Sequence, residues 1–213
     1  MLQGPIVLPE GKATRAVVFL HGFGSDGEDL ITLAPMMAEV LPHTAFFAPN
    51  APERTSMGVG YQWFDDKNFT FINREGIGEA AKHVETYLKE VIEKEHGIPL
   101  ENTVIFGFSQ GTMTTLFTLP RFKEQLAGVV ASSGVAMWSE ELAPDTTQKF
   151  PLLIVHGKDD DVVPYQASEE AERIFKELGY DDVSLHLYEG LAHGIDNQSL
   201  TEAAKFILRV TAP

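Results

Sequence analysis

Residues 103–111 read TVIFGFSQG, and this stretch decides the fold expected for the 213-residue chain. Its apolar, β-branched half predicts a strand, and the G-x-S-x-G pattern that closes it predicts a tight turn into a helix. Gly107 and Gly111 supply the small residues that such a turn requires on either side of a strained Ser109. The pattern also occurs in ordinary turns. The strand before it and the helix-like stretch after it favour a nucleophilic serine.

Strand-like and helix-like segments alternate along the chain. Short apolar runs that are typical of strands covered on both faces lie at 15–20, 45–48, 103–108, 126–131, 151–156 and 183–188, with an edge strand at 6–8. Helical periodicity lies at 77–92, 110–119, 165–178 and 201–210, and Pro35 begins a short helix. This alternation predicts one α/β domain over residues 1–213, with a mostly parallel, doubly wound sheet, helices on both faces and no large lid domain. Sites in such sheets form beyond the carboxyl ends of the strands.

Charge and composition exclude several classes of function. Sixteen Lys and Arg against 31 Asp and Glu leave a net charge of −15, which disfavours nucleic acid and stable membrane association as partners. No apolar run approaches the roughly 20 residues that span a bilayer, and the N-terminus lacks the features of a secretory signal. The absence of cysteine excludes disulfides, thiolate metal sites and a cysteine nucleophile. We therefore expect a cytoplasmic protein.

A serine nucleophile needs a base, and histidine is the usual one. Three histidines follow Ser109 in the sequence. His186 lies inside a strand, where a structural role is expected, and His156 ends a strand and is expected to brace the next loop. His193 lies in the loop after the last strand with a glycine on either side (residues 190 and 194), so it is the predicted base.

A carboxylate that orients this histidine is expected in the run HGKDDDVVP at 156–164. Three adjacent acids, Asp159, Asp160 and Asp161, follow the end of a strand, and spacing alone does not rank them. Two of the three are expected to be solvated.

Donors for an oxyanion are expected from two backbone N–H groups. One belongs to Gln110, directly after the serine, and the other to Phe23 in the glycine-containing loop HGFGSDG at 21–27. These are backbone roles, so the side chains at both positions are expected to carry little information. Phosphate binding by the same loop is disfavoured because G-x-G-x-x-G is absent and Glu28 and Asp29 follow.

Bulky apolar residues are concentrated between positions 57 and 72 and again near 135–138. They are interpreted either as a satellite core or as the walls of an acyl-binding pocket. The loop that carries the acid and the loop that carries the base each add one apolar residue to this predicted pocket. Its predicted lining is Met57, Trp63, Phe64, Phe69, Val135, Met137, Trp138, Val163 and Leu191.

Four segments, at 20–24, 107–111, 156–164 and 191–194, together resemble the phospholipase/carboxylesterase family, and residues 62–65 (QWFD) resemble its Trp-Phe-Asp segment. This family is a group of small α/β-hydrolases that includes acyl-protein thioesterases. The family pattern H-G-x-x-D, followed by an apolar pair and proline, assigns the acid to Asp160, with Asp161 as the alternative. Thr112 departs from the family, which usually has a second glycine there.

The resemblance implies a serine carboxylesterase that acts through an acyl-enzyme on short- to medium-chain acyl esters, with no metal and no cofactor. Thioesters of acylated proteins and lysophospholipids are alternative substrates of the same chemistry. A ligand-binding protein that keeps the fold without catalysis is a remote alternative, because such proteins generally lose one of the three reactive residues. Exposed apolar loops make a homodimer plausible.

Overall fold

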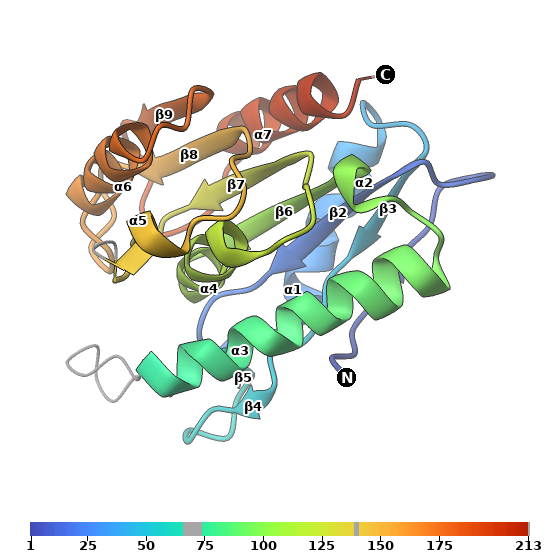
Figure 1. The fold of residues 1–213 in the computed structure, drawn as a ribbon, viewed down its shortest axis with the longest axis horizontal. Coiled ribbons are helices and arrows are strands. Elements are labelled where there is room, and N and C mark those ends of the chain that lie inside the picture. Colours follow the sequence, from blue (N-terminus) through green and yellow to red (C-terminus); the bar gives the residue numbers. More distant parts are fainter. Residues whose placement is uncertain (66–73, 139–140, 213) are drawn as a thin grey trace.

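The computed structural model describes residues 1–65, 74–138 and 141–212. Its centre is a seven-stranded sheet in the order β1-β3-β2-β6-β7-β8-β9 (Figure 1). The strands are β1 (Ile6–Val7), β2 (Arg15–Leu20), β3 (Thr44–Phe47), β6 (Thr103–Phe108), β7 (Gly128–Ser132), β8 (Leu152–Gly157) and β9 (Val183–Tyr188). Among the described strands of this sheet, only β1 pairs antiparallel, so the prediction of a mostly parallel sheet is confirmed.

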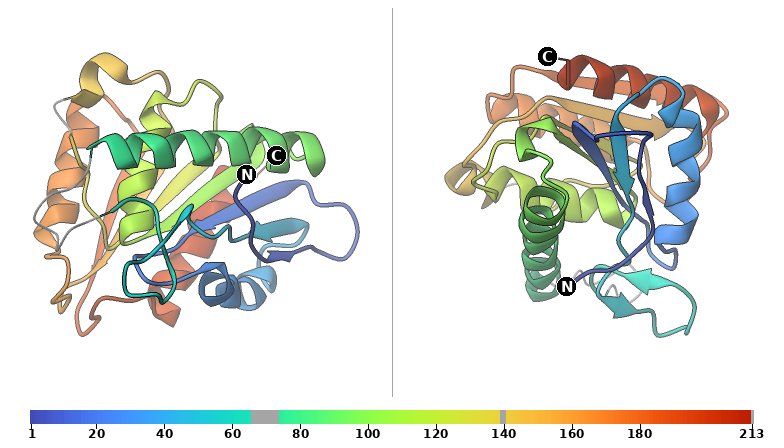
Figure 2. Two further views of the ribbon diagram at one scale, coloured as in Figure 1. Left: turned by 90° about the horizontal axis from the view of Figure 1, so that it is seen from below. Right: turned by 90° about the vertical axis from the view of Figure 1, so that its right-hand side faces the viewer.

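Helices cover both faces of this sheet (Figure 2). Among the described residues they are α1 (Gly27–Leu30), α2 (Ala34–Ala38), α3 (Arg74–Tyr87), α4 (Gln110–Thr118), α5 (Leu142–Asp145), α6 (Gln166–Glu177) and α7 (Asn197–Val210). Short helical turns are η1 (Ile31–Leu33), η4 (Leu100–Asn102) and η5 (Leu119–Arg121), and η3 (Leu88–Glu95) continues α3 with π-helical hydrogen bonds.

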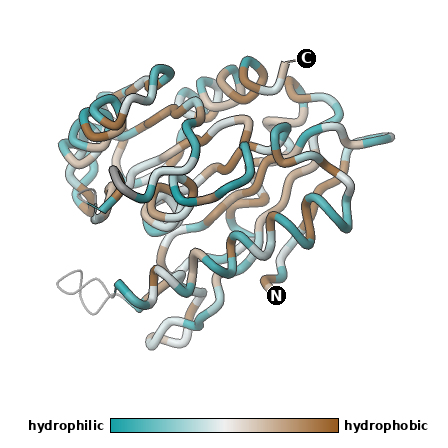
Figure 3. The backbone as a smooth tube through the Cα atoms, viewed as in Figure 1, coloured by the Kyte–Doolittle hydropathy of each residue, from teal (hydrophilic) through white to brown (hydrophobic). Residues whose placement is uncertain are grey.

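The strands alternate their side chains between two cores. In β2, Val18 and Leu20 pack in the core under α3, α4 and α6, whereas Val17 and Phe19 pack in the core under α2 and α7. Hydrophobic segments accordingly run through the central strands, and hydrophilic positions lie on the outer sides of the helices (Figure 3). Burial on both faces explains why these strands are apolar without a polar alternation.

Several features differ from the sequence expectations: the short helices α1 and α5 were not predicted, and β7 begins two residues later than expected. Helix α7 begins at Asn197, four residues before the predicted start at 201, because Asp196 and Ser199 form a capping box. A small antiparallel hairpin, β4 (Glu53–Arg54) with β5 (Tyr61–Gln62), was not predicted. Its strands are only two residues long, too short to give a periodic pattern in the sequence.

The parallel arrangement brings the carboxyl ends of β2, β6, β7, β8 and β9 to one edge of the sheet. We call this edge the carboxyl rim. The segments that follow these strands carry His21 to Phe23, Ser109, Asp160 and His193. Residues that lie far apart in the sequence therefore meet along one line.

Candidate active site

Ser109 occupies the turn between β6 and α4 with a strained backbone, at φ 55° and ψ −116°. Its N–H donates to Ser132 O at 2.9 Å, which fixes the turn against β7. Close contacts leave no room for a side chain at the two flanking glycines. A Cβ on Gly111 would lie 1.9 Å from Leu20 O, and a Cβ on Gly107 would lie 2.7 Å from Thr112 N. The turn is therefore as tight as the G-x-S-x-G pattern predicts.

His193 reaches the serine from the loop after β9. Its Nε2 lies 3.0 Å from Ser109 Oγ, and its Nδ1 lies 2.7 Å from Asp160 Oδ2. The side chain of His193 is 17% exposed, whereas that of Asp160 is fully buried. In the tautomer that satisfies both contacts, Nδ1–H donates to the carboxylate and Nε2 accepts from the serine hydroxyl.

Asp160 is the acid that the structure brings to His193, and Asp159 and Asp161 are exposed to solvent. Its Oδ1 accepts from Val162 N at 2.9 Å and from Val163 N at 2.8 Å. Burial by itself would raise the pKa of Asp160, but the hydrogen bonds from His193 and from these two amides outweigh it and lower the pKa. The carboxylate is thus held ionised and in one orientation.

His156 shares the same carboxylate from the buried side. Its Nε2 lies 3.1 Å from Asp160 Oδ2 and 2.9 Å from Val163 O, and its Nδ1 lies 2.6 Å from Ser168 Oγ. Burial lowers the pKa of His156 in spite of the opposing hydrogen bonds to Val163 and Asp160, so the ring is neutral. It braces the loop that follows β8. His186 lies half-buried in β9.

The two predicted oxyanion donors lie on either side of the serine. Gln110 is the first residue of α4, and Phe23 belongs to the loop after β2. A Cβ on Gly22 would lie 3.2 Å from Ser109 Cβ, so this loop runs directly against the serine. Within the described residues, the N–H groups of Phe23 and Gln110 donate to no protein acceptor. Both remain available to a bound group.

The predicted pocket residues lie in three kinds of environment. Trp63 and Phe64 are 1% and 0% exposed, so their side chains belong to the core and offer almost no surface to a ligand. The other buried members are Met137 and Val163, the half-buried ones are Val135, Trp138 and Leu191, and Met57 is exposed. Phe69 lies outside the described residues.

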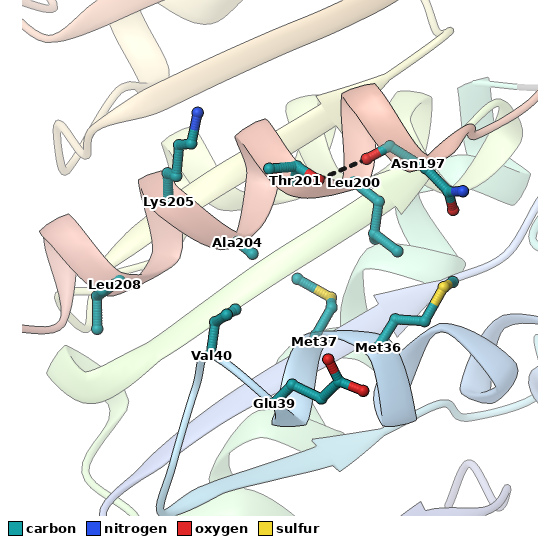
Figure 4. A pocket seen from close by; sticks show the side chains of 10 residues that line it. All are labelled: Met36, Met37, Glu39, Val40, Asn197, Leu200, Thr201, Ala204, Lys205 and Leu208. Atoms are coloured by element: carbon teal, nitrogen blue, oxygen red, sulfur yellow. Dashed lines mark hydrogen bonds between the residues drawn. The ribbon is translucent and has the colours of Figure 1, made fainter.

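An apolar groove lies elsewhere, between α2 and α7 (Figure 4). It has a volume of about 530 Å³ and is lined by side chains that include Met36, Val40, Leu200 and Leu208. None of Ser109, Asp160 and His193 lines it.

The part of the chain that the structure describes contains neither a metal-binding cluster nor a membrane-spanning helix. No group of three or more His, Asp or Glu side chains that could hold a metal ion occurs among residues 1–65, 74–138 and 141–212. Over the same residues, no helix is long and apolar enough to cross a membrane.

A strained serine after a parallel strand, followed in the chain by an acid and then a histidine, defines an α/β-hydrolase fold with its characteristic residue order. The family model described as Phospholipase/Carboxylesterase matches residues 3–211, and the chain belongs to that family. The family comprises hydrolases that include carboxylesterases and thioesterases.

Individual relatives agree with this assignment. The chain is 31% identical over 219 residues to acyl-protein thioesterase 1 of Yarrowia lipolytica, covering 95% of this chain and 96% of the relative. It is 30% identical over 211 residues to acyl-protein thioesterase 1 of Saccharomyces cerevisiae, covering 92% of each. Among solved structures, esterase PE8 superposes with a TM-score of 0.92 at 35% identity, covering 98% of this chain and 99% of that one.

Proposed function

We propose that this protein is a serine carboxylesterase that hydrolyses short- to medium-chain acyl esters through an acyl-enzyme. One observation carries the proposal: a continuous series of hydrogen bonds from Asp160 through His193 to Ser109, with distances of 2.7 Å and 3.0 Å. A serine hydroxyl is a weak nucleophile until a neighbouring base takes its proton, and this series supplies that base and orients it.

Catalysis would proceed in two halves. Ser109 Oγ attacks the acyl carbon while His193 Nε2 takes the hydroxyl proton, and the negative oxygen accepts hydrogen bonds from the N–H groups of Phe23 and Gln110. The Asp160 carboxylate stabilises the imidazolium. Collapse of the intermediate expels the alcohol with the proton from His193 and leaves Ser109 acylated. Water then repeats the sequence, with His193 as base, and releases the acid.

The half-buried residues of the predicted pocket are apolar, which supports an acyl group as the part of the substrate that is recognised. Val135, Trp138 and Leu191 are half-buried, and each packs against one of the two cores. The charge of −15 favours a neutral or cationic substrate over a polyanion. A thioester of an acylated protein is the second candidate, because relatives at about 30% identity are named acyl-protein thioesterase 1.

A fluorophosphonate probe and a set of nitrophenyl esters of increasing acyl length test the proposal. We expect the wild-type protein to be labelled and to show a maximum of kcat/KM within the short to medium acyl lengths. Ser109→Ala should abolish labelling and lower kcat by at least about a thousandfold. Ser133→Ala is the matched control, since it removes another buried serine hydroxyl from the carboxyl rim.

Labelling that persists in Ser109→Ala would refute the nucleophile. Higher kcat/KM for an S-acyl peptide than for every oxyester would replace the carboxylesterase by the thioesterase.

A further inference from the structure

The side chain of Gln110 is engaged in the protein, although only its backbone was expected to matter. It is 3% exposed. Its Oε1 accepts from Trp63 N at 2.8 Å, and its Nε2 donates to Phe64 O at 2.9 Å. The amide thus pairs with the backbone of the 61–64 segment in the way that a neighbouring strand would. The expectation that this side chain carries little information is therefore wrong.

The same segment is attached to the loop after β2. The indole Nε1 of Trp63 donates to His21 O at 2.8 Å. On the other side of Phe23, Gly24 N donates to Tyr61 O at 2.9 Å. Residues 61–64, which we call the bridge segment, therefore hold the Phe23 loop both before and after Phe23, whose N–H is a predicted oxyanion donor.

His21 makes this loop rigid from within. Its Nδ1 donates to Gly22 O at 2.8 Å, and its Nε2 accepts from Ala51 N at 3.0 Å. Acceptance by Nε2 requires the neutral ring. Burial lowers the pKa of His21 more than the hydrogen bond to Gly22 and the nearby acids Asp26 and Asp29 raise it. The carbonyl that receives the indole therefore belongs to a fixed residue.

We propose that Trp63 and Gln110 are positioning residues that set the distance between the two oxyanion donors. The bridge segment connects the two donors. Phe23 follows β2 and Gln110 follows β6, and the bridge segment links the two sites through hydrogen bonds on both sides. Trp63, 1% exposed, acts from behind the site and does not line an acyl pocket. This inference rests on the proposed function.

Donor spacing matters because an oxyanion hole acts on the charge that develops in the transition state. Substrate binding in the ground state depends on it much less. Loss of the bridge should therefore lower kcat and leave KM nearly unchanged, whereas loss of pocket surface would raise KM. The two interpretations of Trp63 give opposite results.

The experiment compares Trp63→Phe and Gln110→Met, alone and combined, in the full chain. Trp63→Phe removes the indole hydrogen bond to His21 O, and Gln110→Met removes the two hydrogen bonds of the amide. Both variants keep most of the side-chain volume, and the backbone N–H of residue 110 remains. We expect kcat to fall about 10- to 100-fold, with KM within about threefold of wild type. Affinity for a trifluoromethyl ketone analogue should fall by the same factor as kcat/KM. The combined variant should lose little more than the worse single one, because both act through one segment.

Thr55→Val is the matched control. It removes a side-chain hydrogen bond from the same hairpin, that of Thr55 Oγ1 to Val59 O at 2.6 Å, and it lies outside the bridge segment. Its kcat should stay within about twofold of wild type.

The inference is overturned if both bridge variants keep wild-type kcat, or if their loss lies in KM. If Gln110→Met fails to fold, Trp63→Phe alone decides the question, by whether its loss lies in kcat or in KM. Fluorophosphonate labelling of wild-type Ser109 separates this result from the proposed function. A labelled wild type with fully active bridge variants refutes the inference alone, whereas an unlabelled wild type refutes the enzyme.

Discussion

The carboxyl rim and the groove between α2 and α7 are opposite kinds of region. At the rim, a strained serine, a buried carboxylate and two histidines are joined by hydrogen bonds of 2.6–3.1 Å. The groove has a volume of about 530 Å³ and a mostly apolar lining, whose polar members are Glu39, Asn197, Thr201 and Lys205. It holds exposed side chains at Met36 (48%) and Val40 (53%) and no comparable polar network.

The difference suggests a rule for the proposed reactive centre, which is set by a polar network that the fold keeps out of water. An unpaired buried polar group costs about 1–3 kcal/mol, so a fully paired network in the interior is specified residue by residue. An apolar groove needs only side chains of suitable size. The rim should therefore be sensitive to single atoms, whereas the groove should tolerate substitution.

The largest effect is expected for Asp160→Asn, which keeps the shape of the side chain but removes its charge. The amide cannot stabilise an imidazolium and favours the wrong tautomer of His193, so kcat should fall by about 10⁴. Asp161→Asn is the matched control on the exposed neighbour and should stay within about twofold of wild type. Initial rates on a nitrophenyl ester measure both variants. Equal losses would contradict the assignment of the acid.

A smaller loss is expected for His156→Phe. The ring donates to Asp160 Oδ2, but Oδ1 keeps its two amide donors, from Val162 and Val163. We expect kcat to fall by about tenfold, and stability to fall by about 1–3 kcal/mol because Ser168 Oγ and Val163 O lose their partner. Urea denaturation and initial rates measure the two effects. A loss as large as that of Asp160→Asn would make His156 part of the reactive centre itself.

Much of the rim was predictable because its signals are local in the sequence. The strand, the strained serine and the two glycines lie within residues 103–111. The carboxylate was harder, since three adjacent acids have the same chemistry and the sequence pattern of the family was needed to choose Asp160. The structure supplies the physical reason: only that position, after the tight Gly157 turn, brings a carboxylate to both histidines.

Contacts between distant segments were not predictable. The side chain of Gln110 pairs with backbone 47 positions away, and Trp63 reaches His21 across 42 positions. Neither contact leaves a periodic or compositional trace. A cluster of aromatic residues is equally typical of a pocket wall and of a core, so Trp63 and Phe64 were assigned to the wall although their side chains are buried.

A further difference between the two regions concerns pH. The rim contains two buried neutral histidines, His21 and His156, whose pKa burial lowers from the ordinary value of 6.5. The unfolded chain binds protons below that value while the folded chain does not. The stability from these rings is therefore complete above about pH 6.5 and is lost as the pH falls toward the lowered values.

The lowered pKa of Asp160 adds a second loss, which begins below its ordinary value of 3.8. Thermal unfolding at a series of pH values between 7.5 and 5 measures the first loss. His156→Phe should show a smaller decrease in Tm over this interval than wild type does, because one of the two rings has been removed. An equal decrease in both proteins would show that His156 contributes nothing to the acid sensitivity.

The smallest effect on catalysis is expected in the groove. Met36→Ser combined with Leu208→Ser replaces two exposed apolar side chains, 48% and 45% accessible, that contact no part of the rim network. Because a polar side chain is readily hydrated at such positions, kcat/KM should stay within about twofold of wild type.

Light scattering on the same variant tests whether the expected homodimer uses this face, since apolar patches of this kind occur at subunit interfaces. A dimeric wild type and a monomeric variant with unchanged kcat/KM would assign the groove to assembly. A large loss of activity in the variant would instead show that the groove and the carboxyl rim are coupled, and it would contradict their independence.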